Sequence, residues 1–286
     1  MLKIHFLNVG KGNCTVIQFP SGRLAIVDID NSRIDDEDDV LQDPLEFLDS
    51  SYPDNSVFRF VLTHPDMDHM AGLAELKEKR TITNFWDTNH DKVLDPGNDD
   101  FGSYDPEDWR AYLHMRGSTS DPKQLYLYRD DSNHYWQDDG VTILSPSPSL
   151  ETLSHDADET DSDKYNHISY VLRIQHEGIV VLLGGDATTD AWDDIYNHYK
   201  STNQLHLLKA HIFLAPHHGS ENNVNPDVFA HIAPEYVVVS VHRGMDYDYD
   251  FYKSLASQGV YSTKHNGNIS VEVSTTVKRI VPERNG

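Results

Sequence analysis

The first thirty residues show the pattern of hydrophobic and polar positions that short β-strands produce. Residues 2–9 alternate between apolar and polar, residues 15–19 follow a glycine-containing turn, and residues 24–29 follow Pro20-Ser21-Gly22. Alternation with a period of two places successive side chains on opposite faces of a sheet, and glycine and proline mark the turns. We therefore expect the chain to begin with a meander of strands.

Short apolar runs and helical patterns alternate along the rest of the chain. The runs that predict buried strands are residues 58–62, 141–144, 169–175, 179–183, 212–215 and 236–241. The segments that predict helices are residues 44–50, 71–80, 106–115, 189–199 and 251–258. Residues 259–273 are typical of a terminal hairpin. Strands in both halves, each followed by a helix, indicate an α/β protein with two sheets and helices outside them.

Residues 87–140 form a polar, acidic segment that is rich in glycine, proline, tyrosine and tryptophan. We interpret it as a long insertion in a single domain of residues 1–286, because no linker divides the chain. Two roles stay open for its aromatic residues: they could stack nucleobases or pack as a small subdomain. These residues are Tyr104, Trp109, Tyr112, Tyr126 and Tyr128, with Trp86 directly before the segment.

Composition and charge limit the classes of function. The chain has 286 residues, 38% of them apolar, and a net charge of −24 from 47 acidic and 23 basic residues. Such a charge repels nucleic-acid backbones at long range. No apolar run approaches the roughly 20 residues that span a bilayer. The single cysteine, Cys14, cannot form an intrachain disulfide and fits core packing in a reducing compartment. We expect a cytoplasmic protein that does not enter a membrane.

The most informative stretch, His64-Pro65-Asp66-Met67-Asp68-His69, follows directly after an apolar run. It contains two histidines and two carboxylates within six residues. A strand end followed by a tight turn can direct all four side chains into one cleft. Imidazoles and carboxylates are ligands for divalent transition metals. Because these groups exceed what one zinc ion requires, the stretch predicts a pair of metals.

Three further places put a metal-binding type of residue at the end of an apolar run. They are Asp28, Asp186 and the pair His217-His218. Each has an ordinary structural alternative: Asp28 as a turn residue, Asp186 as a helix cap, and the histidines as a hydrogen-bonded pair. Next to the dense cluster at residues 64–69, a ligand role becomes the preferred interpretation for all three.

The order of these motifs resembles a known family. His64-x-Asp66-x-Asp68-His69 resembles the second motif of the metallo-β-lactamase superfamily, HxHxDH, with an aspartate in place of the middle histidine. Together with Asn8-Val9-Gly10-Lys11-Gly12-Asn13 and Pro216-His217-His218-Gly219-Ser220, it is similar to the hydrolase domain of the ComEC family of DNA-uptake channels. The resemblance covers residues 3–275. It implies a four-layered αββα metallo-β-lactamase sandwich with a two-metal site at one edge.

The resemblance also implies which residues bind the two ions. His64 and Asp66 would bind the first ion, Asp68 and His69 the second, and Asp186 would bridge them. Asp68 and Asp186 are therefore also the expected catalytic residues.

Other roles follow from the same resemblance. One of His217 and His218 would complete the second site; the family pattern favours His218, with His217 touching substrate. The histidine of the third family motif has two candidates, Asn166 and His167. Asp28 would orient ligating histidines from behind, since such histidines need a partner on the other ring nitrogen. Further residues expected near the cleft are Ser220, Ser240, His242, Thr263 and Lys264.

The ligand set predicts the chemistry. Two ions about 4 Å apart can share a hydroxide that attacks phosphorus in line. Asp66 in place of a histidine makes the first site harder, which favours phosphate oxygens over amides. We expect two divalent ions per chain, manganese or zinc, with magnesium as a further candidate. The predicted function is phosphodiester hydrolysis by a nuclease acting on nucleic acid or nucleotide. The alternatives are a hydrolase of small phosphoesters or cyclic nucleotides, and a metal-poor binding subunit that holds a protein partner through its acidic insertion.

Overall fold

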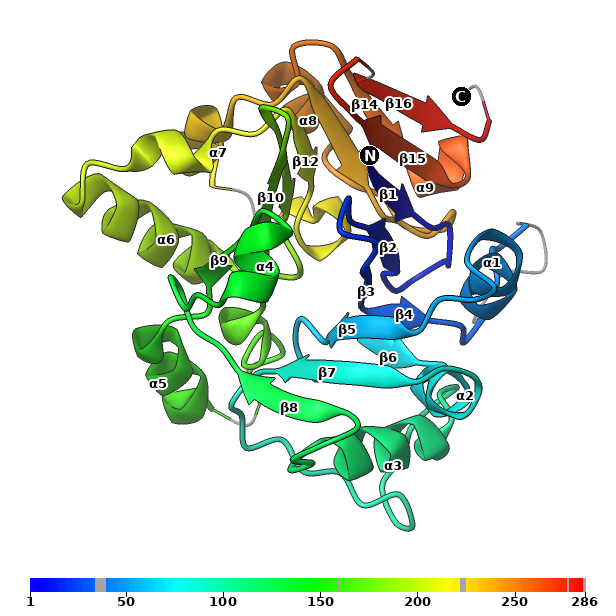
Figure 1. Ribbon diagram of the computed structural model, residues 1–286. Coiled ribbons are helices and arrows are strands. Elements are labelled where there is room, and N and C mark those ends of the chain that lie inside the picture. Colours follow the sequence, from blue (N-terminus) through cyan, green and yellow to red (C-terminus); the bar gives the residue numbers. More distant parts are fainter. Residues whose placement is uncertain (34–39, 159, 222–224, 277, 285–286) are drawn as a thin grey trace.

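Two β-sheets pack face to face and helices cover their outer faces (Figure 1). The computed structural model describes residues 1–33, 40–158, 160–221, 225–276 and 278–284. A hydrophobic core between the sheets contains Ile4 and Phe6 of one sheet and Ile143, Leu172 and Leu183 of the other. This arrangement of layers confirms the predicted αββα sandwich.

The larger sheet contains the N-terminal meander and the C-terminal strands. In spatial order its strands are β16 (Lys278–Pro282), β15 (Ile269–Val273), β1 (Leu2–Phe6), β2 (Thr15–Gln18), β3 (Leu24–Val27), β5 (Val57–Val61), β7 (Ile82–Asp87) and β8 (Lys123–Tyr126). β3, β5, β7 and β8 run parallel to one another. Their carboxyl ends therefore meet at one edge of the sheet.

The second sheet comes from the C-terminal half of the chain. Its strands, in spatial order, are β14 (Gly259–Ser262), β13 (Tyr236–Val239), β12 (Ile212–Leu214), β11 (Ile179–Leu183), β10 (Val171–His176) and β9 (Val141–Ser145). β11 and β12 are parallel neighbours. A short parallel pair, β4 (Ile29–Asp30) with β6 (Met70–Ala71), joins the segment after β3 to the end of the metal-binding stretch.

The helices lie on the outer faces of the two sheets (Figure 1). Over the larger sheet lie α1 (Pro44–Ser51), α2 (Leu73–Lys79) and α3 (Pro106–Met115), and over the second sheet α5 (Pro148–Asp156), α6 (Thr189–Ser201), α7 (Pro226–Ile232) and α8 (Tyr249–Leu255). Two short helices, α4 (His134–Asp138) and α9 (Thr263–Asn266), complete the set within the described ranges. Asp43, Asp105 and Thr188 cap α1, α3 and α6, which explains where these helices begin.

Residues 259–273 do not form the predicted hairpin. β14 pairs with β13 in the second sheet, whereas β15 pairs with β1 in the larger sheet. The short helix α9 carries the chain from one sheet to the other. The prediction was wrong because two apolar strands joined by a short polar segment have the same local pattern whether they pair or separate.

Part of the insertion at residues 87–140 is built into the main fold. Its strand β8 extends the larger sheet at β7. Trp109 and Tyr112 of α3 are fully buried between that helix and the outer face of the larger sheet. Trp136 belongs to the core between the two sheets. Such buried rings cannot stack on nucleobases. Tyr126, by contrast, is 40% exposed.

Two smaller findings bear on the expectations about compartment and membrane. Cys14 is buried in the apolar layer over the larger sheet and carries a free thiol. Within the described residues, no helix combines the length and the hydrophobicity that crossing a bilayer requires.

Candidate metal centre

The predicted ligands gather where strands of both sheets end. Asp28 directly follows β3 and His64 lies three residues beyond β5, its parallel neighbour. Asp186 follows β11, and His218 follows β12. In open sheets with parallel strands, ligands bind beyond the carboxyl ends of the strands. The topology therefore brings residues from distant parts of the sequence to one edge of the sandwich.

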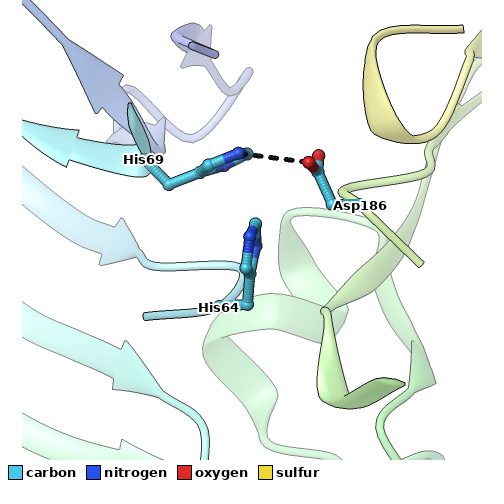
Figure 2. A group of neighbouring side chains, drawn as sticks. All are labelled: His64, His69 and Asp186. Carbon is cyan, nitrogen blue, oxygen red and sulfur yellow. Dashed lines mark ion pairs between the residues drawn. The ribbon is translucent and has the colours of Figure 1, made fainter. Parts of the chain in front are cut away.

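Two overlapping groups of side chains are placed to hold metal ions. His64, His69 and Asp186 form the first group, and Asp68, His69 and His218 form the second. Within each group, the possible ligand atoms all lie within 4.8 Å of one another. Figure 2 shows the two imidazole rings of the first group and the Asp186 carboxylate pointing toward one another. His69 belongs to both groups, so the two positions are adjacent.

The two histidines of the second group lie near the carboxylates of both Asp68 and Asp186. His69 Nε2 lies 3.4 Å from Asp186 Oδ2 and 3.9 Å from Asp68 Oδ2. His218 Nε2 lies 3.6 Å from the same Asp186 oxygen and 3.8 Å from Asp68 Oδ2. Each of the two ring nitrogens thus lies within 4 Å of both carboxylates, and these donor types suit a divalent transition metal.

Asp28 holds the far side of the site. Its buried carboxylate accepts hydrogen bonds from the Thr63 backbone N–H at 2.7 Å, the Thr63 hydroxyl at 2.8 Å and His69 Nδ1 at 2.8 Å. This contact puts the His69 proton on Nδ1, so the Nε2 lone pair is directed at the cluster. The Asp28 backbone has φ of 58°, a conformation that aspartate tolerates better than most residues. The geometry is that expected of a residue orienting a ligating histidine.

A tight turn positions His218. His217, His218 and Gly219 have consecutive positive φ angles of 47°, 55° and 78°. Non-glycine residues at positive φ are uncommon, and such strain gathers at functional sites. His218 Nδ1 donates to the backbone carbonyl of Ser240 at 3.1 Å, which leaves Nε2 facing Asp68 and Asp186.

The electrostatics of this cluster fit a bound cation. Burial alone would lower the pKa of His69, but Asp186, Asp28 and Asp68 raise it well above its usual value. Burial would raise the pKa of Asp186, whereas His69 and His218 lower it well below the ordinary range. His69 Nε2 is buried and makes no hydrogen bond with the described residues. Concentrated carboxylates around a ring nitrogen without a hydrogen bond are what a metal site requires.

The cluster opens into a cavity of about 470 Å³. Its lining also contains four other predicted residues, Asp66, Asn166, His217 and Ser220, together with Ser162, which was not predicted. Asn166 is 3% exposed, and its Oδ1 makes no hydrogen bond with the described residues. An amide oxygen of this kind can contact a metal or a substrate.

His167, the other candidate for the third motif, is not part of either group. Its Nδ1 lies 2.8 Å from Thr188 Oγ1, and its Nε2 lies 3.9 Å from Asp161 Oδ2. Of the two candidates, the structure therefore brings Asn166 to the cavity lining and leaves His167 bonded to the cap of α6.

Four further predicted residues make mainly backbone contacts. Ser240 Oγ donates to the Gly12 carbonyl at 3.3 Å. Thr263 Oγ1 accepts from Val241 N at 2.9 Å, Lys264 Nζ donates to the Met245 carbonyl at 2.6 Å, and His242 Nδ1 accepts from Gly244 N at 3.0 Å. The contacts of Thr263, Lys264 and His242 stabilise loops beside the cavity. The backbone carbonyl of Ser240 also accepts the hydrogen bond from His218.

Sequence reasoning missed two contacts at the site. Lys92 Nζ lies 2.5 Å from Asp66 Oδ1, and Asn13 Nδ2 donates to Asp186 Oδ1 at 3.4 Å. Asn13 belongs to the N-terminal loop motif, so its position in that motif was an available signal. Lys92 stands in the acidic insertion, 26 residues after Asp66, and no local pattern points to it.

No family model matches this sequence, and no curated protein does. Solved structures do: the metallo-β-lactamase fold protein YhfI from Bacillus subtilis aligns with a TM-score of 0.54 at 12% identity, covering 95% of this chain and 100% of that chain. Igni18, a metallo hydrolase from the archaeon Ignicoccus hospitalis, gives a TM-score of 0.54 at 13% identity, with 95% and 100% covered.

The chain has the metallo-β-lactamase fold. A third similar structure, a diphosphatase from the PhnP family, gives a TM-score of 0.51 at 10% identity and covers 96% of this chain and 98% of that chain. The match confirms the fold class predicted from the motifs. In this metallo-β-lactamase fold, the two groups of possible ligands lie at the edge where the resemblance implied a metal site.

Proposed function

We propose that this protein is a metal-dependent hydrolase that cleaves phosphodiester bonds in nucleic acid or nucleotides. The observation that carries the proposal is the pair of overlapping groups His64-His69-Asp186 and Asp68-His69-His218 beside one cavity. Asp66 and the carboxylates of those groups make a donor set harder than histidines alone, which suits manganese or zinc bound to phosphate oxygens. The motif resemblance to the ComEC-type hydrolase domain supports the same substrate class.

The residues have distinct roles in this proposal. His64 and Asp66 would hold one ion, Asp68, His69 and His218 the other, and Asp186 would contact both. Ions held there would act as Lewis acids on the phosphate and lower the pKa of water. Asp28 and the Ser240 carbonyl keep the ligating nitrogens of His69 and His218 directed at the site.

Substrate contacts come from the rest of the cavity. His217 is only partly buried and lines the cavity together with Ser220 and Asn166. These groups can donate hydrogen bonds to phosphate oxygens or to a leaving group. Asp68, which is 28% exposed, can reach both an ion and a proton on the leaving oxygen.

A second candidate is hydrolysis of a small phosphoester or cyclic nucleotide. The net charge of −24 disfavours a long polyanion, and a cavity of about 470 Å³ is of a size that takes a mononucleotide. One of the similar structures is a diphosphatase. A third candidate is a metal-poor binding subunit that holds a protein partner through the acidic insertion. For each candidate we propose a cytoplasmic setting, which the single cysteine favours.

A manganese-supplemented assay distinguishes these candidates. It compares single-stranded DNA, duplex DNA, cyclic dinucleotides and bis(p-nitrophenyl) phosphate as substrates. We expect cleavage of at least one phosphodiester, with Asp68→Ala reducing the rate by at least about a hundredfold. Asp54→Ala removes a carboxylate from an exposed loop and should leave the rate unchanged. Cleavage that survives Asp68→Ala, or no cleavage of any substrate by protein loaded with metal, would contradict the proposal.

A further inference from the structure

The insertion places a lysine directly against a predicted metal ligand. Lys92 Nζ lies 2.5 Å from Asp66 Oδ1, and it also lies 5.1 Å from the centre of the Tyr165 ring. The lysine side chain is 18% exposed. A carboxylate on one side and the face of an aromatic ring on the other both attract a positively charged ammonium group. Lys92 is therefore a cation held beside Asp66.

A buried network fixes the segment that carries this lysine. The Lys92 backbone N–H donates to His90 Nδ1 at 3.0 Å, and His90 Nε2 lies 2.6 Å from Tyr112 Oη of α3. Arg116 Nη2 donates to the His90 carbonyl at 2.7 Å. His90 is 5% exposed and Tyr112 is fully buried. Since buried polar networks of this kind make a local conformation rigid, the position of Lys92 is built into the fold.

The two candidate metal positions consequently have different electrostatic surroundings. Asp68 and Asp186 lie against His69 and His218, whose ring nitrogens can themselves be metal ligands. Asp66 lies against the Lys92 ammonium, which has no lone pair to donate to a metal. An ion beside Asp68, Asp186, His69 and His218 therefore meets side chains that can all donate to it. At His64 and Asp66 an incoming cation meets the Lys92 charge and must share Asp66 with it.

We propose that Lys92 makes the two metal positions unequal. The protein holds one divalent ion tightly at Asp68, His69, Asp186 and His218, and it takes up an ion at His64 and Asp66 weakly. This inference rests on the proposed function, because it requires that the cluster bind divalent cations. The inference gives the insertion a function: α3 and the segment before it hold the charge of Lys92 beside the metal position at His64 and Asp66.

Two measurements on metal-free protein supplied with Mn²⁺ test the inference. Calorimetric titration gives the affinity of each binding step, and elemental analysis after gel filtration gives the number of ions retained. Wild-type protein should show a tight and a weak binding step, separated by about a hundredfold or more, and should retain close to one ion. In Lys92→Met the weak step should tighten by at least about tenfold, while the tight step changes far less. Lys123→Met, which removes an exposed lysine from the same insertion, should behave as wild type.

Lys92→Arg keeps the charge and should keep the inequality, which separates an effect of charge from a loss of folding. Two equally tight steps in wild type, or a weak step unaffected by Lys92→Met, would overturn the inference and leave the proposed metal-dependent function standing. Equal tightening in Lys92→Met and Lys123→Met would overturn it as well, by showing a general effect of net charge. Absence of Mn²⁺ binding in folded wild-type protein would overturn the proposed function itself.

Discussion

Asp28 Oδ2 accepts a hydrogen bond from His69 Nδ1 at 2.8 Å, on the side of the ring opposite to the nitrogen that faces Asp186. The contact links the first strand meander to the metal-binding stretch 41 residues later. It fixes both the tautomer and the orientation of His69, which belongs to both groups of possible ligands.

Replacing this carboxylate should weaken metal binding. Asn tolerates the positive φ of position 28, so Asp28→Asn should keep the backbone while losing the charged acceptor. We expect the affinity for Mn²⁺ or Zn²⁺ to fall by roughly 10- to 100-fold, measured by calorimetry with circular dichroism as the check on folding. Asp54→Asn, on an exposed loop, is the matched control. Unchanged affinity in Asp28→Asn would show that Asp28 does not orient a ligand.

The loop at Gly12 packs against the metal-binding stretch with no room for a side chain. A Cβ on Gly12 would lie 1.9 Å from the Asp68 carbonyl oxygen and 2.5 Å from Asp30 Cβ. We expect Gly12→Ala to destabilise the protein by about 1–3 kcal/mol, measured by urea unfolding, and to reduce metal binding. Gly259→Ala is the control, because its nearest neighbour would be Tyr236 at 3.9 Å. Equal stability of the two variants would contradict this account.

Removing metal should lower the stability of the whole fold. The site gathers Asp66, Asp68 and Asp186 beside three buried histidines, and a ligand that binds only the folded state stabilises it by mass action. At a free metal concentration about 100 times Kd, the gain is about 2.7 kcal/mol. Chelation should therefore lower Tm, and added Mn²⁺ should restore it in a concentration-dependent way. A wild-type Tm that does not change with chelator would argue against a bound ion. So would an Asp186→Asn variant whose Tm equals that of wild type.

The sequence predicted those parts of the fold whose signal is local. The run at residues 58–62 is apolar apart from Arg59, so strand β5 and the site after it were recognisable together. Strand β8 could not be found this way: Lys123 and Tyr126 are exposed and Gln124 and Leu125 are half-buried, so an edge strand leaves almost no hydrophobic pattern. Helix α5 was likewise missed in a segment that is polar on most of its surface.

The same dependence on a local sequence signal explains which residues of the site could be predicted. Asp66, Asp68 and His69 stand together in the sequence, and Asp28, Asp186 and His218 each follow an apolar strand, so strand ends were sufficient to find them. The contact between Lys92 and Asp66 depends on a hydrogen-bond network that includes α3. No pattern in the neighbouring sequence predicts this contact. Nor does spacing alone distinguish Asn166 from His167, since only the direction of each side chain separates them.

A histidine far from the site should make stability depend on pH. His5 Nδ1 lies 2.8 Å from Ser270 Oγ, and Nε2 lies 2.8 Å from Tyr52 Oη. Burial is the main cause that lowers the pKa of His5 to about 4; Lys3 lowers it further and Glu272 opposes the shift.

Because the folded-state pKa is below the unfolded value of about 6.5, the unfolded chain takes up the proton first as pH falls. The contribution of His5 is therefore present above about pH 6.5 and is lost between about pH 6.5 and pH 4. Between pH 7 and pH 5 the loss should be about 2 kcal/mol. In urea unfolding at the two pH values, His5→Gln should lose about that much less stability than wild type, whereas His134→Gln, at an exposed position, should match wild type. Identical pH dependence in all three proteins would show that His5 titrates normally in the fold.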